Sequence, residues 1–329
     1  MVTTVDYHTA GEPFRIVTGG IDPIPGATIL EKRRYAQRHL DDIRALLVNE
    51  PRGHADMYGC FVTDPVAEGS DLGVLFFHNA GFSTACGHGT IALATYALES
   101  GVRPARAPET ELTIDVPSGT LPVTASVRDG RVERVRFRNV PSFVHSEGIG
   151  IPTGGGELKV DVAFGGAFYA SVSARDAGLE IEPGSLPALI ELGRKLKHAV
   201  ESQREIVHPD EPELRDVYGV IFFAEEGEQP LVQRNVAVFA DGEVDRSPCG
   251  SGTSARLALL HKQGRIGVSD LLVHRSIVGT EFEGRIVEET KVAERPAVVT
   301  EVSGAAHLTG RHEFVLDTAD PLGTGFLLR

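Results

Sequence analysis

The chain has 329 residues, of which 41% are hydrophobic and 24% are charged, a balance typical of a water-soluble folded protein. This length suits about two domains and excludes a minimal module that depends on disulfide or metal staples. The formal net charge of −14 disfavours nucleic acid and anionic membranes as partners, because both repel a negative surface.

The N-terminal stretch lacks the basic and apolar segments of a secretory signal, and no run approaches about 18 apolar residues. We therefore expect neither a signal peptide nor a membrane span. The three cysteines, Cys60, Cys86 and Cys249, are too few for a disulfide framework. These features predict a cytoplasmic protein with reduced thiols.

Short β-branched runs bounded by Gly, Pro and Asp predict a sheet-rich chain with a few helices. The predicted strands are, in chain order, 112–116, 158–164, 217–223, 231–239, 271–278 and 314–316. Residues 31–49 and 186–203 show helical spacing of apolar residues and predict amphipathic helices on the outside of a sheet. Gly154 to Gly156 are expected in a surface loop, because no helix pattern follows them as in a phosphate-binding loop.

Two further predicted helices, 90–99 and 254–261, are apolar on most sides, which is typical of buried helices. Each follows the same frame, Cys-Gly-X-Gly-Thr, at 86–90 and at 249–253. A glycine suited to a C-terminal helix cap lies fifteen residues after each cysteine, at Gly101 and Gly264. This internal repeat predicts two similar domains, each a curled sheet packed around one central helix.

The Cys-Gly-X-Gly-Thr frame can bind an anion where it opens a helix. The first N–H groups of a helix have no partner within it, and the helix dipole adds positive charge there. We expect each frame to bind a carboxylate, or to lower the pKa of its cysteine toward neutrality. A single cysteine beside a glycine is usually inert filler. The recurrence of the frame at Cys86 and Cys249 favours function, whereas Cys60 lacks the frame and is expected to be a core or supporting residue.

Two such thiols on opposite faces of one carbon would perform proton transfer. One thiolate would remove the substrate Cα proton, and the opposite thiol would deliver a proton to the other face. His88 and Asp245 lie close to the two cysteines in the chain and could bind the substrate nitrogen or tune the thiols. The alternatives are a structural loop histidine and an ordinary turn aspartate.

At these residues the chain resembles the proline racemase superfamily, which includes proline racemases, 4-hydroxyproline 2-epimerases and trans-3-hydroxy-L-proline dehydratases. The resemblance covers nearly the whole chain. The stretches that carry it are DYHTAGEPFRIV at 6–17, NEPRGHADMYG at 49–59, ACGHGT at 85–90, VAFGGAFYA at 162–170, VDRSPCGSGTSARLA at 244–258, EGRIVEETKV at 283–292 and the C-terminal DPLGTGFLLR.

The resemblance implies an α+β fold of the diaminopimelate-epimerase type, with two pseudo-symmetric halves, each a curled β-sheet around a central helix. We expect the first half to comprise residues 1–122 plus about 304–329 and to carry Cys86. The second half, 123–303, is expected to carry Cys249. The resemblance also implies a cofactor-independent enzyme, without pyridoxal phosphate or metal, that acts on a small cyclic amino acid. A homodimer is expected by analogy alone.

Residue roles follow from the matched motifs. The implied acid/base pair is Cys86 and Cys249. The residues that the resemblance assigns to substrate binding are His88 and Asp245 at the nitrogen, Gly87, Gly250 and Ser251 at the carboxylate, and Tyr58 and Phe239 against the ring.

Three positions bear on which member of the superfamily this is. Cys249 favours racemisation or epimerisation, because the dehydratases usually have threonine there. Tyr58 stands where proline racemases commonly have phenylalanine, and in this the chain resembles the dehydratases. Ala85 stands where methionine is common. The sequence therefore leaves open proline, 4-hydroxyproline or 3-hydroxyproline as substrate, epimerase or dehydratase as activity, and which thiol rests as thiolate.

Other classes of protein fit less well. A binding or sensor protein would use the two domains as an anion-binding clamp, with cysteines as redox reporters. A metal hydrolase is disfavoured because no His-x-x-x-His or Cys-x-x-Cys spacing surrounds the candidate ligands His8, His54, His78 and His88. A dinucleotide-binding fold is disfavoured because no Gly-x-Gly-x-x-Gly joins a strand to a helix.

Overall fold

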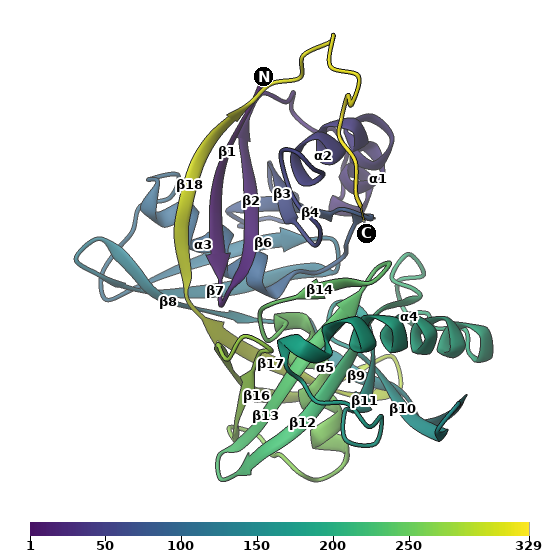
Figure 1. Ribbon diagram of the computed structural model, residues 1–329. Helices are drawn as coiled ribbons and strands as arrows, with labels where there is room; N and C mark the ends of the chain where they lie inside the picture. The colour runs from purple at the N-terminus through teal and green to yellow at the C-terminus, as the bar shows by residue number, and fades with distance from the viewer. Residues whose placement is uncertain (329) are drawn as a thin grey trace. The chain divides into compact units, whose positions relative to one another are not determined.

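The computed structural model describes residues 1–328. The chain forms two compact units, each a mixture of strands and helices (Figure 1), which confirms the predicted α+β class. The first unit comprises Met1–Arg136 and the C-terminal segment from Ala305 onward, and the second comprises Phe137–Gly304.

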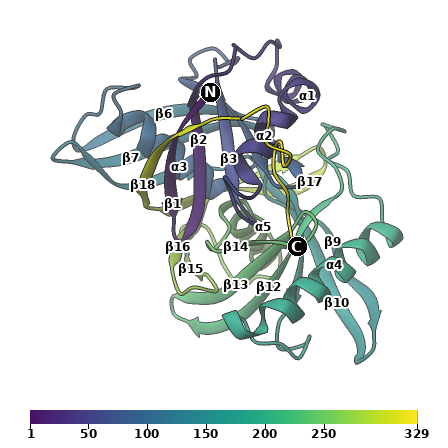
Figure 2. The ribbon, with the colours of Figure 1, turned by 45° about the horizontal axis from the view of Figure 1, so that its top comes forward.

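The first unit contains a mixed sheet. Its strands are β1 (Val2–Thr9), β2 (Glu12–Gly19), β3 (Tyr58–Thr63), β4 (Leu72–His78), β5 (Gly81–Phe82), β6 (Glu109–Val116), β7 (Gly119–Arg128) and β18 (Ala306–Phe314), with β8 (Arg131–Arg138) at the boundary between the units. The order β18–β1–β2–β3–β4–β6–β7 brings the two ends of the chain together, and Figure 2 shows β1, β2 and β18 side by side.

The prediction of a single amphipathic helix at 31–49 is wrong. Two helices, α1 (Ile29–His39) and α2 (Asp41–Val48), occupy this segment. Leu40 between them has φ −122° and ψ 9°, which is outside the helical range. The acidic pair at the start of α2, Asp41 and Asp42, suits a helix N-terminus because it complements the positive end of the helix dipole.

Helix α3 (Gly87–Glu99) is the buried helix of the first unit. Eleven of its thirteen residues are buried, and it packs against β1, β2, β7 and β18. The helix begins three residues before the predicted start. Gly101 follows its end with φ +78°, which confirms the predicted C-terminal glycine cap.

The second unit is a closed ring of strands around one helix. The strands are β9 (Ser142–Thr153), β10 (Gly156–Phe164), β11 (Phe168–Ser173), β12 (Val217–Glu228), β13 (Leu231–Phe239), β14 (Glu243–Asp245), β15 (Leu271–Arg275), β16 (Glu281–Val292) and β17 (Arg295–Gly304). Pairing runs β9–β10–β11–β12–β13–β15–β16–β17 and returns from β17 to β9. Helix α5 (Gly250–Lys262) contacts five of these strands, as the predicted curled sheet around a helix requires.

Helix α5 matches α3 in length and burial, and Gly264 with φ +69° follows its end. A short 3₁₀ turn, η1 (Pro183–Ser185), leads into α4 (Leu186–Gln203), which coincides with the prediction. Figure 1 shows α4 lying along the outside of β12 and β13, and its buried residues recur on one face. The amphipathic pattern therefore predicted both the helix and its outer position.

Most of the predicted strands are present. The strand at 231–239 matches β13, and those at 112–116, 158–164 and 217–223 lie within longer strands. The strand at 271–278 ends at Arg275, because the chain turns from Ser276 to Gly279. The strand predicted at 314–316 is wrong, because β18 ends at Phe314 opposite Val2, where its partner β1 begins. Gly154 and Gly155 form the exposed turn between β9 and β10, as predicted, whereas Gly156 begins β10.

The first unit extends further along the chain than the expected boundary at 122. A division there would cut β7, whose residues 119–126 pair with β6. The hairpin keeps both strands in one unit, which therefore continues to Arg136. In the part of the chain that the structure describes, no helix is both long and apolar enough to cross a bilayer.

Candidate active site

Cys86 occupies the N-cap of α3. Its Sγ accepts a hydrogen bond from the Gly89 N–H at 3.3 Å, and the residue is 5% exposed. The backbone N–H and the hydroxyl of Thr90 both donate to the Cys86 carbonyl, each at 2.9 Å. The start of the helix therefore holds the sulfur with one of the N–H groups that lack a partner within the helix.

The second glycine of the frame makes room for the sulfur. A Cβ atom on Gly89 would lie 2.7 Å from Cys86 Sγ and 2.5 Å from the ring of Phe14. Only a residue without a side chain fits between them.

His88 lies against the Cys86 sulfur, with Nε2 3.3 Å from Sγ. Its ring meets the rings of Phe14 and Tyr58 edge-on, at centroid distances of 5.6 and 5.0 Å. Its carbonyl accepts a hydrogen bond from the Thr9 hydroxyl at 2.9 Å. The imidazole is therefore held between two aromatic rings, within hydrogen-bonding reach of the thiol.

Tyr58 begins β3 opposite Phe14 on β2, and the two rings stack with centroids 6.2 Å apart. Its hydroxyl donates to the Ser83 hydroxyl, so its hydrogen is used within the unit. Sequence reasoning missed Phe14, although it belongs to the matched stretch DYHTAGEPFRIV, and Ser83, which lies outside the matched stretches.

Cys249 heads α5 in a strained conformation. Its φ is +63°, a region that residues with a side chain rarely adopt, and such strain often marks functional positions. The N–H and hydroxyl of Thr253 donate to the Cys249 carbonyl at 2.7 and 2.8 Å, as Thr90 does in the first unit. A Cβ atom on Gly252 would lie 2.8 Å from Cys249 Sγ, so this glycine also makes room for a sulfur.

Tyr169 on β11 is a site residue that sequence reasoning missed. Its hydroxyl accepts a hydrogen bond from the Cys249 thiol at 3.5 Å and lies 2.7 Å from Ser251 Oγ. The residue belongs to the matched stretch VAFGGAFYA, but eighty positions separate it from Cys249. Only the packing of β11 against α5 brings the phenol to the sulfur.

The expected lowering of the thiol pKa is wrong for Cys249. Burial raises the pKa of this thiol, and the nearby Asp245 carboxylate raises it further. Hydrogen bonds involving Tyr169, Gly252 and Ser251 lower it by less. Desolvation therefore outweighs the favourable helix terminus in its effect on the pKa of Cys249. Burial also raises the pKa of Cys60, which lies in the core on β3 as expected.

Asp245 forms the turn that precedes Cys249. Its carboxylate accepts a hydrogen bond from the Ser247 N–H at 2.8 Å, and the Ser247 hydroxyl accepts one from the Cys249 N–H at 3.1 Å. The predicted turn role is therefore present, and the carboxylate also raises the pKa of Cys249.

Phe239 at the end of β13 stacks on Tyr218, with ring centroids 5.4 Å apart, and the Tyr218 ring meets the Tyr169 ring edge-on at 5.8 Å.

The three residues expected at the substrate carboxylate begin the two buried helices. Gly87 is the first residue of α3, and Gly250 and Ser251 are the first two residues of α5. Their N–H groups belong to the helix starts, where no carbonyl within the helix can accept them. Each unit thus brings its cysteine, its frame and its predicted neighbours together.

Comparisons with known proteins show the family of this chain. The family model described as proline racemase matches residues 4–327. This chain belongs to the proline racemase family. A trans-3-hydroxy-L-proline dehydratase of Bacillus cereus is 46% identical over 99% of this chain and 98% of that protein. A proline racemase of Clostridioides difficile is 43% identical over 100% of this chain and 98% of that protein.

A solved structure of a hydroxyproline epimerase from Agrobacterium vitis, with bound trans-4-hydroxy-L-proline, has a TM-score of 0.93 and 35% identity to this chain. The similarity covers 99% of this chain and 95% of that one. The relatives named dehydratase and racemase thus have comparable identity to this chain, and the epimerase of known structure has a lower one. The comparisons establish an enzyme of the proline racemase family.

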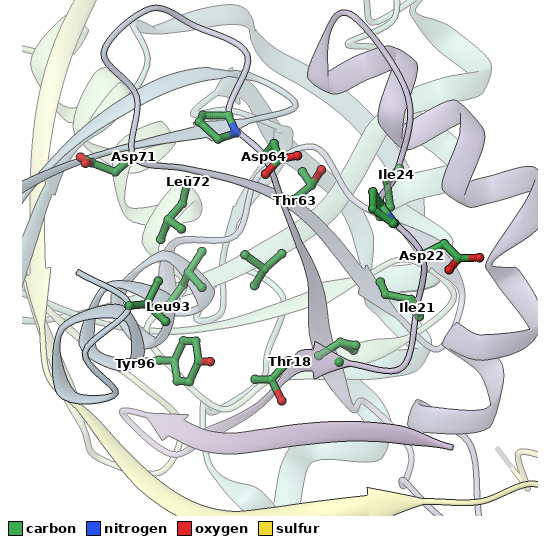
Figure 3. A pocket seen from close by; sticks show the side chains of 16 residues that line it. Thr18, Ile21, Asp22, Ile24, Thr63, Asp64, Asp71, Leu72, Leu93 and Tyr96 are labelled. Atoms are coloured by element: carbon green, nitrogen blue, oxygen red, sulfur yellow. The ribbon is translucent and has the colours of Figure 1, made fainter.

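This proline racemase family member also has surface cavities that lie away from the predicted site residues. One of about 410 Å³ in the first unit is lined by Leu72, Leu93 and Tyr96, and none of the predicted site residues lines it. Figure 3 shows Asp22 and Asp71 at its edge with their carboxylates directed away from its centre. Within residues 1–328, no three His, Cys, Asp or Glu side chains gather as a set of metal ligands.

Proposed function

We propose that this protein is a cofactor-independent racemase or epimerase that inverts Cα of proline or a hydroxyproline, with Cys86 and Cys249 as its acid/base pair. The observation that carries the proposal is the equivalent setting of the two sulfurs. Each lies at the head of a buried helix, with a threonine bonded to the cysteine carbonyl and a glycine that leaves space for the sulfur.

The proposed reaction moves one proton off the substrate and one proton onto it. A thiolate takes the Cα proton, and the thiol of the other cysteine gives its proton to the opposite face. The bond electrons left on Cα spread onto the substrate carboxylate. Backbone N–H groups at the starts of α3 and α5 would stabilise that charge. In the reverse direction the cysteines exchange roles.

The two thiols differ in their partners, which supports an assignment for the resting enzyme. Cys249 donates to Tyr169 as a thiol, and its pKa is raised by burial. Cys86 accepts a hydrogen bond from the Gly89 N–H and lies beside the His88 imidazole, whose Nε2 is 3.3 Å from the sulfur. We assign Cys86 as the resting thiolate and Cys249 as the resting thiol.

A small cyclic amino acid is the proposed substrate. Tyr58 and Phe239 would lie against its ring, and His88 and Asp245 would bind its nitrogen. The tyrosine at position 58, where proline racemases commonly have phenylalanine, supports a hydroxylated substrate.

Proton NMR in D₂O tests the proposal, with proline, trans-4-hydroxy-L-proline and trans-3-hydroxy-L-proline in parallel. Loss of the Cα–H signal identifies the substrate, and formation of the inverted isomer identifies the reaction. Cys86→Ser and Cys249→Ser should each lower turnover by roughly 10²-fold to 10⁴-fold, the usual contribution of a general acid or base. Cys60→Ala is the control and should retain turnover. Near-normal turnover in both serine variants would refute the mechanism.

A dehydratase is the second candidate, supported by the 46% identity to the Bacillus cereus dehydratase and by the tyrosine at position 58. Its reaction also begins with loss of the Cα proton, after which a β-hydroxyl leaves as water. The same NMR experiment distinguishes it, because trans-3-hydroxy-L-proline would then give a ring imine or keto acid and no inverted isomer.

A further inference from the structure

A chain of three polar atoms begins at the Cys249 sulfur. The thiol donates to Tyr169 Oη at 3.5 Å, and Oη lies 2.7 Å from Ser251 Oγ. The three residues are buried, with exposed fractions of 5%, 1% and 3% in that order. They belong to β11 and to the first turn of α5, within one unit.

Both hydroxyl groups in this chain can donate or accept a hydrogen bond. With Cys249 protonated, the thiol donates to Tyr169, and the Tyr169 hydroxyl donates to Ser251. With Cys249 as thiolate, the Tyr169 hydroxyl donates to the sulfur, and the Ser251 hydroxyl donates to Tyr169. The change requires rotation about two C–O bonds, and each hydroxyl proton stays on its own oxygen.

We propose that Tyr169 and Ser251 form a reversible hydrogen-bond chain that supports Cys249 both as proton donor and as thiolate. This inference rests on the proposed function, in which Cys249 gives its proton to substrate Cα and takes one back in the reverse direction. Tyr169 acts as a positioning residue, because it serves the reaction through the sulfur.

The need for such a chain follows from the surroundings of Cys249. A buried thiolate is costly unless hydrogen-bond donors surround it, and the neighbouring Asp245 carboxylate increases that cost. A fixed donor would favour only the thiolate, and a fixed acceptor would favour only the thiol. A pair of hydroxyls serves both states, whereas Cys86 has an imidazole beside it instead.

The test measures the reactivity of Cys249 without substrate. The full-length protein is treated with iodoacetamide between pH 6 and pH 10, and peptide mass spectrometry follows the carboxamidomethylation of Cys249. Tyr169→Phe removes only the hydroxyl, so we expect the midpoint of the pH profile to rise and alkylation at pH 8 to fall about 10-fold or more, since a hydrogen bond to a charged group is lost. Ser251→Ala should shift the midpoint in the same direction by less, and Ser251→Thr should restore it.

Two controls accompany these variants. The Cys86 peptide in the same digest should keep its wild-type profile, and Tyr7→Phe, a buried tyrosine of the other unit, should leave the Cys249 midpoint unchanged. An unchanged Cys249 midpoint in Tyr169→Phe overturns the inference. Should Tyr169→Phe lose its native circular dichroism, an unchanged midpoint in Ser251→Ala overturns it instead.

The result is distinguishable from a failure of the proposed function. Alkylation reports on the sulfur and its hydroxyl partners whether or not any substrate is turned over. Near-normal inversion of Cα in both Cys86→Ser and Cys249→Ser would refute the proposed function and leave the alkylation profiles to decide on the hydrogen-bond chain. A loss of packing alone would lower stability in Tyr169→Phe without moving the pH profile of Cys249.

Discussion

At the scale of single residues, the structure explains the residue type at most positions of the Cys-Gly-X-Gly-Thr frame. The hydroxyls of Thr90 and Thr253 donate hydrogen bonds to the carbonyls of Cys86 and Cys249. The glycines at 89 and 252 face the sulfurs at distances that leave no room for a side chain. The frame was visible in the sequence as a repeat, and these contacts explain why both copies use the same residue types.

Replacement of the second glycine should therefore displace the sulfur. In Gly252→Ala the new methyl group would lie 2.8 Å from Cys249 Sγ and 2.7 Å from Ile221 Cδ1, so the sulfur or the helix start must shift. A displacement of about 1 Å at a reacting atom can cost roughly 10²-fold in rate. We expect a loss of that size in the deuterium exchange of the substrate Cα–H.

Gly154→Ala is the matched control, because the new methyl group would meet no atom within 4 Å in the turn between β9 and β10. It should retain wild-type exchange. Gly89→Ala should behave like Gly252→Ala, since its methyl group would contact Cys86 Sγ. Wild-type activity in Gly252→Ala would show that the sulfur can be held without this glycine.

At the scale of elements, α3 and α5 are copies of one design. Both have thirteen residues, both are buried along most of their length, and a glycine with positive φ follows each of them. Because strands pack around both helices, these glycine caps determine where the chain leaves the buried interior. The spacing between cysteine and glycine was sufficient to predict the C-terminal cap of each helix.

The caps can be tested separately from the chemistry. Gly101→Ala and Gly264→Ala add a methyl group where nothing lies within 4 Å, but at φ +78° and +69°. A residue with a Cβ costs roughly 1–2 kcal/mol in this left-handed conformation. We expect urea unfolding to show a decrease of about that size in the free energy of unfolding, with Cα–H exchange by the folded enzyme unchanged.

The control for this pair is Gly155→Ala, in a turn without positive φ, which should be nearly neutral. A neutral result for Gly264→Ala would mean that the helix end relaxes to another conformation. A loss of activity at full stability would mean that the cap also influences the distant cysteine.

At the scale of the whole molecule, buried histidines link stability to pH. Burial and the nearby Arg256 lower the pKa of His274 to about 3, and its Nδ1 lies 2.7 Å from the Thr253 hydroxyl. Burial also lowers the pKa of His145 and of His208. The unfolded chain binds protons at these residues at a pH where the folded protein does not.

The free energy of unfolding should therefore fall as the pH drops below about 6.5, the ordinary pKa of histidine. The contribution of His274 to this fall should level off near pH 3. At pH 5 this residue alone should cost about 2 kcal/mol relative to neutral pH, because it titrates in the unfolded state only. Urea unfolding at pH 7 and pH 5 measures the difference.

His274→Asn keeps a polar group near Thr253 without a titratable ring, and should make the dependence on pH shallower. The free energy of unfolding of each variant at pH 5 is compared with that of the same variant at pH 7, so that any packing defect cancels. His198→Asn, at an exposed position on α4, is the control and should keep the wild-type dependence. An equally steep dependence in His274→Asn would assign the pH effect to other groups.

The sequence by itself determined the features that local chemistry controls. Repetition of a frame with a fixed glycine spacing located α3 and α5, apolar residues on all sides of them predicted burial, and one-sided periodicity predicted α4 on the outside. The family membership followed from motifs along the whole chain. The signals that define each of these helices lie within about twenty consecutive residues, where backbone preference and hydrophobic period act directly.

Only the tertiary structure decided which distant groups surround each sulfur and what they do to it. Tyr169 meets Cys249 because β11 lies in the ring of strands around α5, and Phe14 and Tyr58 enclose His88 because β2 and β3 are neighbours. The raised pKa of Cys249 follows from the same packing. The helix terminus can be read from the sequence, but desolvation depends on every atom that excludes water from the thiol, and here it is the larger effect.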